Sequence, residues 1–203
     1  MPVVVIDDEV IIGFNQKKLA EKLGLDARDA VAGSASWLAV KYDAILGAVV
    51  DATRQLTPQR LEMVFPNRQI SMRAHVLHLF SFAEAGWLTY DNGRFNADDM
   101  QTTSKRVSGI TTVEGVCDYG DKVRRDIVGF LRKSDNKAAL DRIVYCHYGG
   151  DVSVQEVLRI MLRHSTHHLK QMYWFMETHM ALKPAKPAKA KDLEGIVTPK
   201  ELF

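Results

Sequence analysis

The sequence predicts a mainly α-helical protein, an up-down antiparallel four-helix bundle that follows a small N-terminal β-hairpin and helix. Two observations predict this fold class. From residue 26 to about residue 180, apolar residues recur at spacings of three and four, as they do along one face of an α-helix. Residues that start and stop helices divide this stretch into four long segments. Four such helices with short connections pack as an antiparallel bundle.

Residues 1–25 have a different pattern. Two short runs of Val and Ile flank a turn at Asp7-Asp8, which predicts a β-hairpin. Asn15 is the expected N-cap of a following helix that Gly24 closes. Two strands and one helix bury too little apolar surface to fold alone. This piece must therefore pack on the main body, on a second subunit or on something missing from the chain.

The four long helices are expected to start at recognisable caps. Asp26 is the expected N-cap of the first helix, and Ser71 that of the second, which ends near Gly93. Ser153 and Glu156 have the spacing of a capping box, which starts the fourth and longest helix. Between the third and fourth helices, residues 142–151 are typical of an extended segment and a turn. The expected helices span residues 26–56, 71–91, 113–130 and 153–180.

The C-terminal residues differ again in composition. Residues 183–191 combine Lys, Pro and Ala, which favours an extended, solvated linker. Residues 193–203 regain apolar side chains and have the composition of a docking segment, but the sequence does not indicate where they dock. The expected organisation is therefore a hairpin and helix over 1–25, a bundle over 26–182 and a tail over 183–203.

Composition narrows the classes of function. The 27 basic and 25 acidic residues leave a formal charge of +2, much of it in the Lys-rich tail, so nucleic-acid binding gains little support. Apolar runs are far shorter than the roughly 20 residues of a membrane-spanning helix. The N-terminus lacks the basic region and cleavage site of a signal peptide. We therefore expect a cytoplasmic protein with no membrane or nucleic-acid partner.

The two cysteines carry no sign of redox or metal chemistry. Cys117 and Cys146 lie far apart in the sequence and form neither a CxxC pair nor a disulfide framework. Because free cysteines are most often buried, we expect two buried structural thiols.

The histidines give the most specific signal. His164 and His168 lie four residues apart, so their rings project from one face of the fourth helix about one turn apart, a spacing at which both reach a single metal ion. Gln171 continues the same stripe, which is otherwise apolar and is expected to face inward. His78 on the second helix is the best candidate for a third ligand. The pattern thus predicts a divalent-metal site held by His78, His164 and His168.

Other histidines have simpler interpretations. A single histidine on such a helix is more often a hydrogen-bonded core or boundary residue than a ligand. His75, His167 and His179 are interpreted as solvent or rim residues, and His147 as part of a surface turn or of the rim of the pocket. Ser165 occupies the position that a metalloprotease of the His-Glu-x-x-His type fills with its Glu, so that chemistry is excluded.

The run from Ser71 to His78-Leu79, together with His164-x-x-x-His168-x-x-Gln171, resembles the DinB/YfiT-like superfamily of metal-dependent enzymes. The resemblance covers about residues 26–180. It implies a four-helix bundle in which His78, His164 and His168 hold a divalent ion, zinc or nickel, with water in the open positions. It also implies that Gln171 is a polar residue that supports the ligands or orients water.

The first 25 residues resemble the C-terminal third of a glutaredoxin. Pro2, Gly13, Phe14 and Asn15 carry this likeness. The cysteine-containing strand and helix that precede this part in glutaredoxins are absent from the chain, so no thiol redox activity is implied. Two explanations remain open: a fragment of a longer fused protein, or a remnant that serves for packing or dimerisation.

Three neutral imidazoles leave coordination positions open, which is the arrangement of a catalytic metal site. Two chemistries compete: transfer of a low-molecular-weight thiol of the glutathione type to a small-molecule electrophile, and hydrolysis. The glutaredoxin likeness favours the thiol slightly. The alternative is a non-catalytic, metal-stabilised dimerisation or binding module. No residue is identifiable as a general base, and a homodimer is expected.

Overall fold

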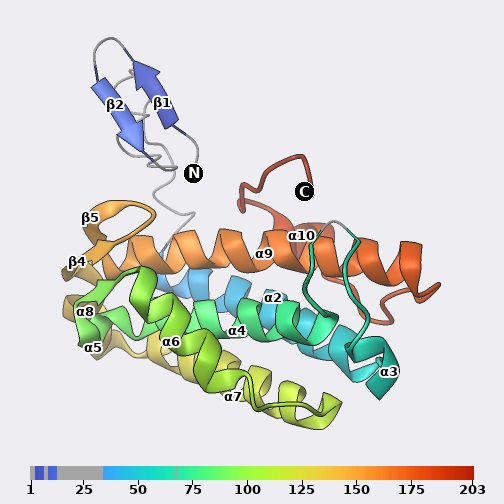
Figure 1. Ribbon diagram of the computed structural model, residues 1–203. Helices are drawn as coiled ribbons and strands as arrows, with labels where there is room; N and C mark the ends of the chain where they lie inside the picture. The colour runs from blue at the N-terminus through green and yellow to red at the C-terminus, as the bar shows by residue number, and fades with distance from the viewer. Residues whose placement is uncertain (1–2, 7–8, 13–33, 67) are drawn as a thin grey trace.

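The computed structural model describes residues 3–6, 9–12, 34–66 and 68–203, and it is mainly helical (Figure 1). Helix α2 packs against α7 and α9, and α4 packs against the same two helices. These contacts place the four long helices side by side (Figure 1). Their bounds are Ala35–Arg54 for α2, Met72–Trp87 for α4, Val113–Arg132 for α7 and Val154–His179 for α9.

Side-chain caps start these helices. The Ser71 hydroxyl accepts a hydrogen bond from the Ala74 amide at the start of α4, and that of Ser153 accepts one from Glu156 at the start of α9. Both positions were predicted. Helix α2 begins after Ser34, and the predicted cap at position 26 lies outside the described residues.

The core lies between the four helices and contains the predicted apolar stripes. The apolar residues that recur at spacings of three and four along α2 and just beyond its end are all buried: Leu38, Tyr42, Ile45, Val49, Ala52 and Leu56. Helix α4 approaches α9 closely, because a side chain at Gly86 would overlap Met161. This close packing brings the two histidine-bearing helices together.

Several shorter elements connect the long helices. Helix α6 was not predicted, because it is largely polar and lacks an apolar stripe of its own. It begins with a capping box formed by Asn96 and Asp99. The backbone of Gly93 has a φ of 74° and ends α5, where the sequence predicted a stop. The short helices are α3 (Pro58–Leu61), α5 (Thr89–Asn92), α6 (Ala97–Val107), η1 (Ser134–Asn136), α8 (Lys137–Asp141) and α10 (Ala190–Leu193).

Two small sheets complete the described structure. Strands β1 (Val3–Ile6) and β2 (Glu9–Ile12) pair antiparallel, as the hairpin prediction requires. The predicted turn at 7–8 and the helix expected from Asn15 lie outside the described residues. The predicted extended segment forms β4 and β5, which pair antiparallel, and β3 adds to β4 in parallel. Their bounds are Arg94–Phe95 for β3, Ile143–Cys146 for β4 and Gly150–Ser153 for β5.

The C-terminal segment folds back on the helices. Residues 183–189 form neither a helix nor a strand and are mostly exposed, and α10 follows them. The Lys41 ammonium on α2 donates a hydrogen bond to the Lys191 carbonyl oxygen at 2.6 Å, and that of Lys170 on α9 donates to Thr198 Oγ1 at 2.6 Å. The segment thus docks along α2 and α9, a place that the sequence did not indicate.

Both predicted thiols are buried. Cys117 and Cys146 are free, and burial raises the pKa of each. Of the described helices, none combines the length and apolar character needed to cross a membrane.

Candidate metal site

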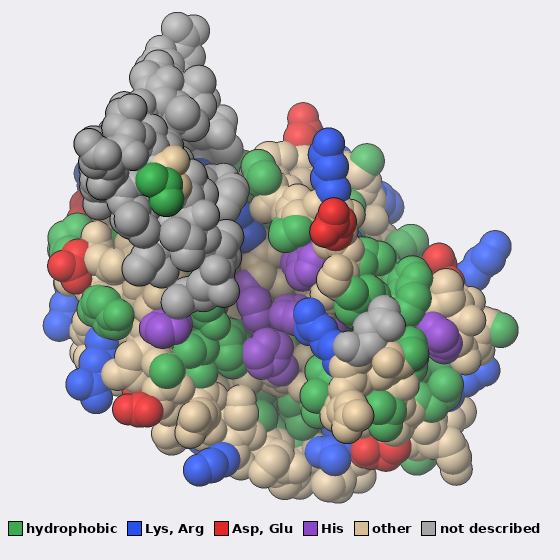
Figure 2. Space-filling model, turned by 45° about the horizontal axis from the view of Figure 1, so that its top comes forward, with side chains coloured by type: hydrophobic (Ala, Val, Ile, Leu, Met, Phe, Trp, Pro, Cys, Tyr) green, Lys and Arg blue, Asp and Glu red, His purple; other side chains and the backbone are tan. Residues whose placement is uncertain are grey.

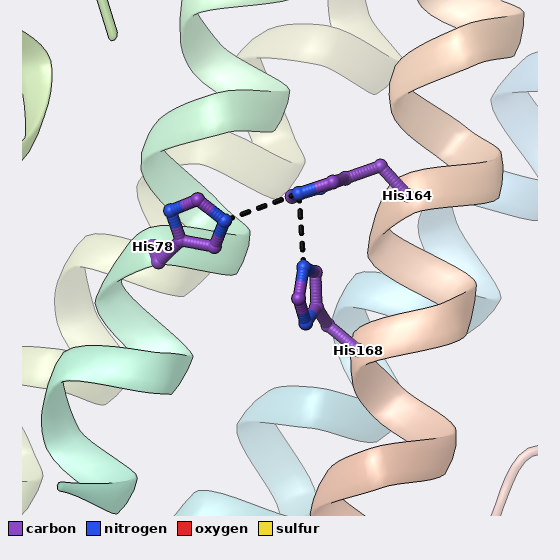
Figure 3. A group of neighbouring side chains, drawn as sticks. All are labelled: His78, His164 and His168. Atoms are coloured by element: carbon purple, nitrogen blue, oxygen red, sulfur yellow. Dashed lines mark hydrogen bonds between the residues drawn. The ribbon is translucent and has the colours of Figure 1, made fainter. Parts of the chain in front are cut away.

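Three histidine side chains from α4 and α9 point toward one another between the two helices (Figure 3). The Nε2 atom of His164 lies 3.1 Å from Nε2 of His78 and 2.9 Å from Nε2 of His168. One nitrogen from each ring falls within a group whose atoms are all within 4.8 Å of one another. The structure therefore brings together the three residues that the sequence singled out as metal ligands.

Gln171 is completely buried and contacts His168 one turn earlier on α9. Its side-chain nitrogen donates hydrogen bonds to the Leu202 carbonyl oxygen and to His167 Nε2, the latter at 3.1 Å. Because a carbonyl oxygen only accepts, the amide nitrogen must face Leu202, and Gln171 Oε1 faces His168. His168 Nδ1 donates to that oxygen at 2.7 Å. This bond places the proton of neutral His168 on Nδ1 and leaves a free lone pair on Nε2.

The protons available to the three rings cannot satisfy both short nitrogen contacts. Because His168 Nε2 carries only a lone pair, its contact with His164 needs a proton on His164 Nε2. That proton would then point away from His78, and a proton on His78 Nε2 would meet a nitrogen with no free lone pair. One of the two contacts is therefore left without a hydrogen bond. A cation that accepts three lone pairs removes this conflict.

The spacing of the nitrogens also fits a metal ion. Two nitrogen ligands at the usual zinc distance are about 3.3 Å apart in tetrahedral geometry. Two of the three separations in the structure, 3.1 Å and 2.9 Å, are close to this value, and the third is within 4.8 Å. The donor set of three imidazoles is one that zinc, nickel and other divalent transition metals accept. The residues present thus fit a divalent ion.

The site keeps its histidines neutral. Burial lowers the pKa of His78 to about 4, and the nearby Arg68 charge contributes in the same direction. Burial and the neighbouring histidines lower the pKa values of His164 and His168 well below the ordinary range. Neutral imidazole is the form that binds a metal. At neutral pH the three rings therefore present lone pairs rather than positive charges.

Aromatic rings line the site. Phe82, one turn after His78, stacks on the His164 ring with 4.9 Å between centroids and an interplanar angle of 14°. It also contacts the His78 ring at 4.0 Å. On the opposite side, His75 contacts His168 edge-on at 4.9 Å. These rings limit the rotation of the three histidines.

The interpretation of His75 as a solvent or rim residue is wrong. Its side chain is completely buried, and its Nε2 donates a hydrogen bond to the His168 carbonyl oxygen at 2.9 Å. Helix α4 is covered by α9, α7, α6 and α3, so its buried surface is wider than one stripe. His75 therefore faces α9 beside the site, and burial lowers its pKa to about 4.

The remaining histidines lie farther from the metal-ligand group. His167 is half-buried and touches the site through Gln171, and His179 is exposed near the end of α9. His147 lies on the connection between β4 and β5, where its ring contacts Tyr148. These three positions agree with the rim or surface roles expected for them.

Two features of the site have no counterpart in the sequence analysis. Leu202 reaches the site because the C-terminal segment folds back, and no pattern in the sequence indicated that contact. Arg68 acts on the histidines through its charge. It follows a Pro-containing break in the helical pattern, so no helical periodicity related it to His78.

The fold and the site together define a helical protein with three inward-facing histidines shared by two helices. A family model described as the DinB superfamily matches residues 42–172, which span most of α2 through α9. The chain belongs to the DinB superfamily. No curated protein and no solved structure matches the chain. The resemblance drawn from the histidine motif is thereby confirmed, whereas the glutaredoxin likeness of the first 25 residues stays a prediction.

Proposed function

We propose that this protein is a metal-dependent enzyme in which His78, His164 and His168 hold one divalent ion, zinc or nickel. The observation that carries the proposal is the proton conflict at His164 Nε2, which contacts two other ring nitrogens and cannot form a hydrogen bond with both. Gln171 supports it, because its hydrogen bond to His168 Nδ1 leaves the Nε2 lone pair directed at the site.

The favoured reaction is the transfer of a low-molecular-weight thiol of the glutathione type to a small electrophile. When bound, a divalent ion with open coordination positions lowers the pKa of a thiol or of water and polarises a carbonyl. In thiol transfer, the sulfur forms a bond to the electrophilic carbon, the leaving group departs with its electron pair, and the thiol proton passes to solvent. Hydrolysis is the second candidate reaction, and it uses the same three histidines.

Access to solvent supports an enzyme over a purely structural site. His78 and His164 are partly exposed, whereas a closed structural site hides its ligands. In the space-filling view, several histidines lie at the bottom of a hollow in the surface (Figure 2). A small molecule can reach the ligands from that side. The competing proposal is a non-catalytic dimerisation or binding module that the metal stabilises.

The proposal includes a wider architecture and setting. We take α2, α4, α7 and α9 as an up-down antiparallel four-helix bundle, with residues 26–182 as one unit between an N-terminal piece and a C-terminal tail. Their mutual packing supports this arrangement. We also propose a cytoplasmic homodimer with a small-molecule substrate and without a nucleic-acid or membrane partner.

The test is the metal content of protein purified without a histidine tag, measured by inductively coupled plasma mass spectrometry. We expect about one divalent ion per chain in the wild type and none in the variant that combines His164→Ala with His168→Ala. His179→Ala is the matched control, because it removes an exposed histidine from the same helix. Absence of metal after reconstitution with zinc and with nickel would refute the metal site.

Chelation separates the enzyme from the structural module. Removal of the ion from a structural site unfolds the protein, because metal binding there contributes folding free energy. For an enzyme, we expect the far-ultraviolet circular dichroism to remain helical after chelation, while thiol transfer stops. Loss of the helical signal on chelation would support the module instead.

A further inference from the structure

Residues 197–203, at the end of the chain, form a strap that docks on α9, the helix that bears two of the candidate metal ligands (Figure 1). The strap contains no helix or strand, and Thr198 and Leu202 are its half-buried residues. Within the described part of the chain, two hydrogen bonds tie it to α9: the Lys170 ammonium donates to Thr198 Oγ1 at 2.6 Å, and Gln171 Nε2 donates to the Leu202 carbonyl oxygen. A segment with so few anchors detaches at low cost while the helices stay folded.

The Phe203 ring is another anchor of the strap. Its centroid lies 4.8 Å from that of Trp174 in an edge-on contact and 6.4 Å from that of Phe65. The residue stays 44% exposed, and Arg68 Cζ lies 5.7 Å from the centre of its ring. None of these contacts involves a candidate metal ligand. Substitution of Phe203 therefore weakens the docking of the strap without touching the ligands.

The Gln171 side chain lies between the strap and the candidate ligand His168. Its Oε1 accepts from His168 Nδ1 at 2.7 Å, and its Nε2 donates to the Leu202 carbonyl oxygen and to His167 Nε2. A nitrogen of a neutral imidazole either donates or accepts, depending on the tautomer, so the two histidines fit either orientation of the amide. A carbonyl oxygen only accepts. The contact that fixes the orientation of the Gln171 amide is therefore the one with Leu202.

The orientation of this amide decides which nitrogen of His168 carries the proton. If the amide turns over, Gln171 Nε2 donates to His168 Nδ1 and Oε1 accepts from His167. The proton of neutral His168 must then be on Nε2, the atom that lies 2.9 Å from His164 Nε2. A protonated ring nitrogen has no lone pair for a metal ion. One orientation of the amide thus permits metal binding by His168, and the other opposes it.

We propose that the strap is a switch for metal binding at the three-histidine site. In the docked strap, Leu202 holds the Gln171 amide in the orientation that keeps the His168 Nε2 lone pair available. When the strap undocks, the amide adopts both orientations, and the affinity for the metal falls by the fraction that is lost. Because such coupling is reciprocal, the bound metal also favours the docked strap. The inference rests on the proposed metal site and adds its regulation.

The first measurement is the zinc affinity of the full chain, in competition with a chromogenic chelator of known affinity. Phe203→Ala removes the ring anchor, and Thr198→Val removes the acceptor of Lys170 while keeping the shape of the side chain. Each variant is expected to bind zinc about threefold to fivefold more weakly, the size of the effect of one net hydrogen bond. Val197→Ala is the matched control, because Val197 is 60% exposed in the same strap, and it should keep the wild-type affinity.

Gln171→Glu separates orientation of the amide from simple covering of the site. A carboxylate only accepts, so it keeps the His168 proton on Nδ1 whether or not the strap is docked. It also repels the Leu202 carbonyl oxygen, which favours undocking. Zinc affinity in this variant is expected to equal or exceed that of the wild type, and adding Phe203→Ala should change it less than twofold.

Nitrogen-15 NMR of the metal-free protein measures the tautomer of His168, because protonated and unprotonated ring nitrogens have well-separated chemical shifts. The signals are assigned by their absence in His168→Gln. In the wild type, we expect the proton on Nδ1. Phe203→Ala should increase the share of rings protonated on Nε2, whereas Gln171→Glu should not. Circular dichroism verifies that each variant is folded.

The outcomes distinguish this inference from the proposed metal site. If the chain binds one zinc ion and neither Phe203→Ala nor Thr198→Val weakens it, the switch is overturned and the metal site stands. A loss in Phe203→Ala that persists in the Gln171→Glu background, or an unchanged His168 tautomer, overturns the role of the amide. A chain that takes up no zinc overturns the metal site and the switch together.

Discussion

Helix α4 carries two groups of buried polar side chains that differ in how they are satisfied. Toward α9, His75 and His78 meet His164 and His168. Toward α7 and α6, Glu84 is 5% exposed and accepts a hydrogen bond from the Tyr119 hydroxyl at 2.6 Å. The Arg106 guanidinium on α6 also donates a hydrogen bond to the Glu84 carboxylate and forms an ion pair with it. The Lys122 ammonium nitrogen on α7 lies 3.8 Å from Glu84 Oε1.

The two groups differ in whether their buried polar atoms have hydrogen-bond partners. The Glu84 group is internally satisfied: its carboxylate has donors and opposite charges from two neighbouring helices. Such a group contributes to the stability of the fold. The histidine group lacks a consistent proton arrangement, and the Nδ1 atoms of His75 and His164 are buried without partners among the described residues. A bound cation would remove the conflict at the Nε2 atoms, whereas the two Nδ1 atoms would stay without partners in the described part of the chain.

The largest expected effect is on metal affinity. His164→Leu removes the nitrogen that lies between the other two, so zinc affinity should fall more than about 100-fold. In the metal-free protein, the same change removes an unsatisfied polar side chain, so the free energy of unfolding should stay the same or rise. Zinc titration and urea unfolding of the metal-free chain measure the two quantities. Marked destabilisation of the metal-free protein would mean that the histidines already satisfy one another.

The same type of substitution in the other group should have the opposite result. Glu84→Leu leaves the Tyr119 hydroxyl without its acceptor and Arg106 without its counter-ion, so the free energy of unfolding should fall by about 2–3 kcal/mol. Because half of the Arg106 side chain is exposed, water can solvate its charge, so we expect no larger loss of unfolding free energy. Zinc affinity should not change. Urea unfolding and zinc titration test this expectation, and a loss of zinc binding would show that the two groups are coupled through α4.

Acid should act first on the histidine group. Burial lowers the pKa of His75 in the folded state to about 4, so between pH 4 and about 6.5 the unfolded state binds more protons than the folded state. Stability of the metal-free protein is therefore fully present above pH 6.5 and is lost as the pH falls toward 4. His75 alone contributes about 3 kcal/mol to this loss.

Urea unfolding at a series of pH values measures the slope. The variant His75→Leu should show a smaller slope than the wild type, whereas His179→Leu, at an exposed position, should show the same slope. A wild-type stability that does not change between pH 7 and pH 5 would contradict the buried, neutral state of these rings.

The sequence predicted the long helices and the metal-ligand group because both depend on regular spacing. The stripe from Val157 to Phe175 has a helical period, which was enough to predict that His164 and His168 share one inward face. His78 was less well predicted by the pattern, because it lies beside the apolar stripe of α4 rather than on it, and the family resemblance supported it. The caps at Ser71 and Ser153 were equally local signals, since a cap and the amide that it accepts from lie three residues apart.

What the sequence missed depends on contacts between distant residues. The burial of His75 follows from the number of helices around α4, which no stripe on α4 itself reveals. Helix α6 buries only Val107 and packs Met100 against the core, and its Arg106 reaches Glu84, 22 residues away. Leu202 and Gln171 lie 31 residues apart in the sequence, and they meet only because the C-terminal segment folds back. Spacing rules apply within an element and give no information about such contacts.

The smallest effect tests whether the tail influences the site through Gln171. Gln171→Leu removes the acceptor of His168 Nδ1, so the ring loses the bond that keeps its proton away from Nε2. Because residues that support a ligand typically change metal affinity by about 10- to 100-fold, we expect zinc affinity to fall about tenfold. Gln55→Leu is the matched control: Gln55 accepts a hydrogen bond from the Ala185 amide in the tail and does not contact the histidines. If both variants lose zinc affinity equally, the tail acts by docking as a whole. If only Gln171→Leu loses zinc affinity, the hydrogen bond from His168 Nδ1 to the Gln171 amide is what keeps the His168 Nε2 lone pair available. A single hydrogen bond would then matter for the histidine group, as the bonds to the Glu84 carboxylate do for the other group.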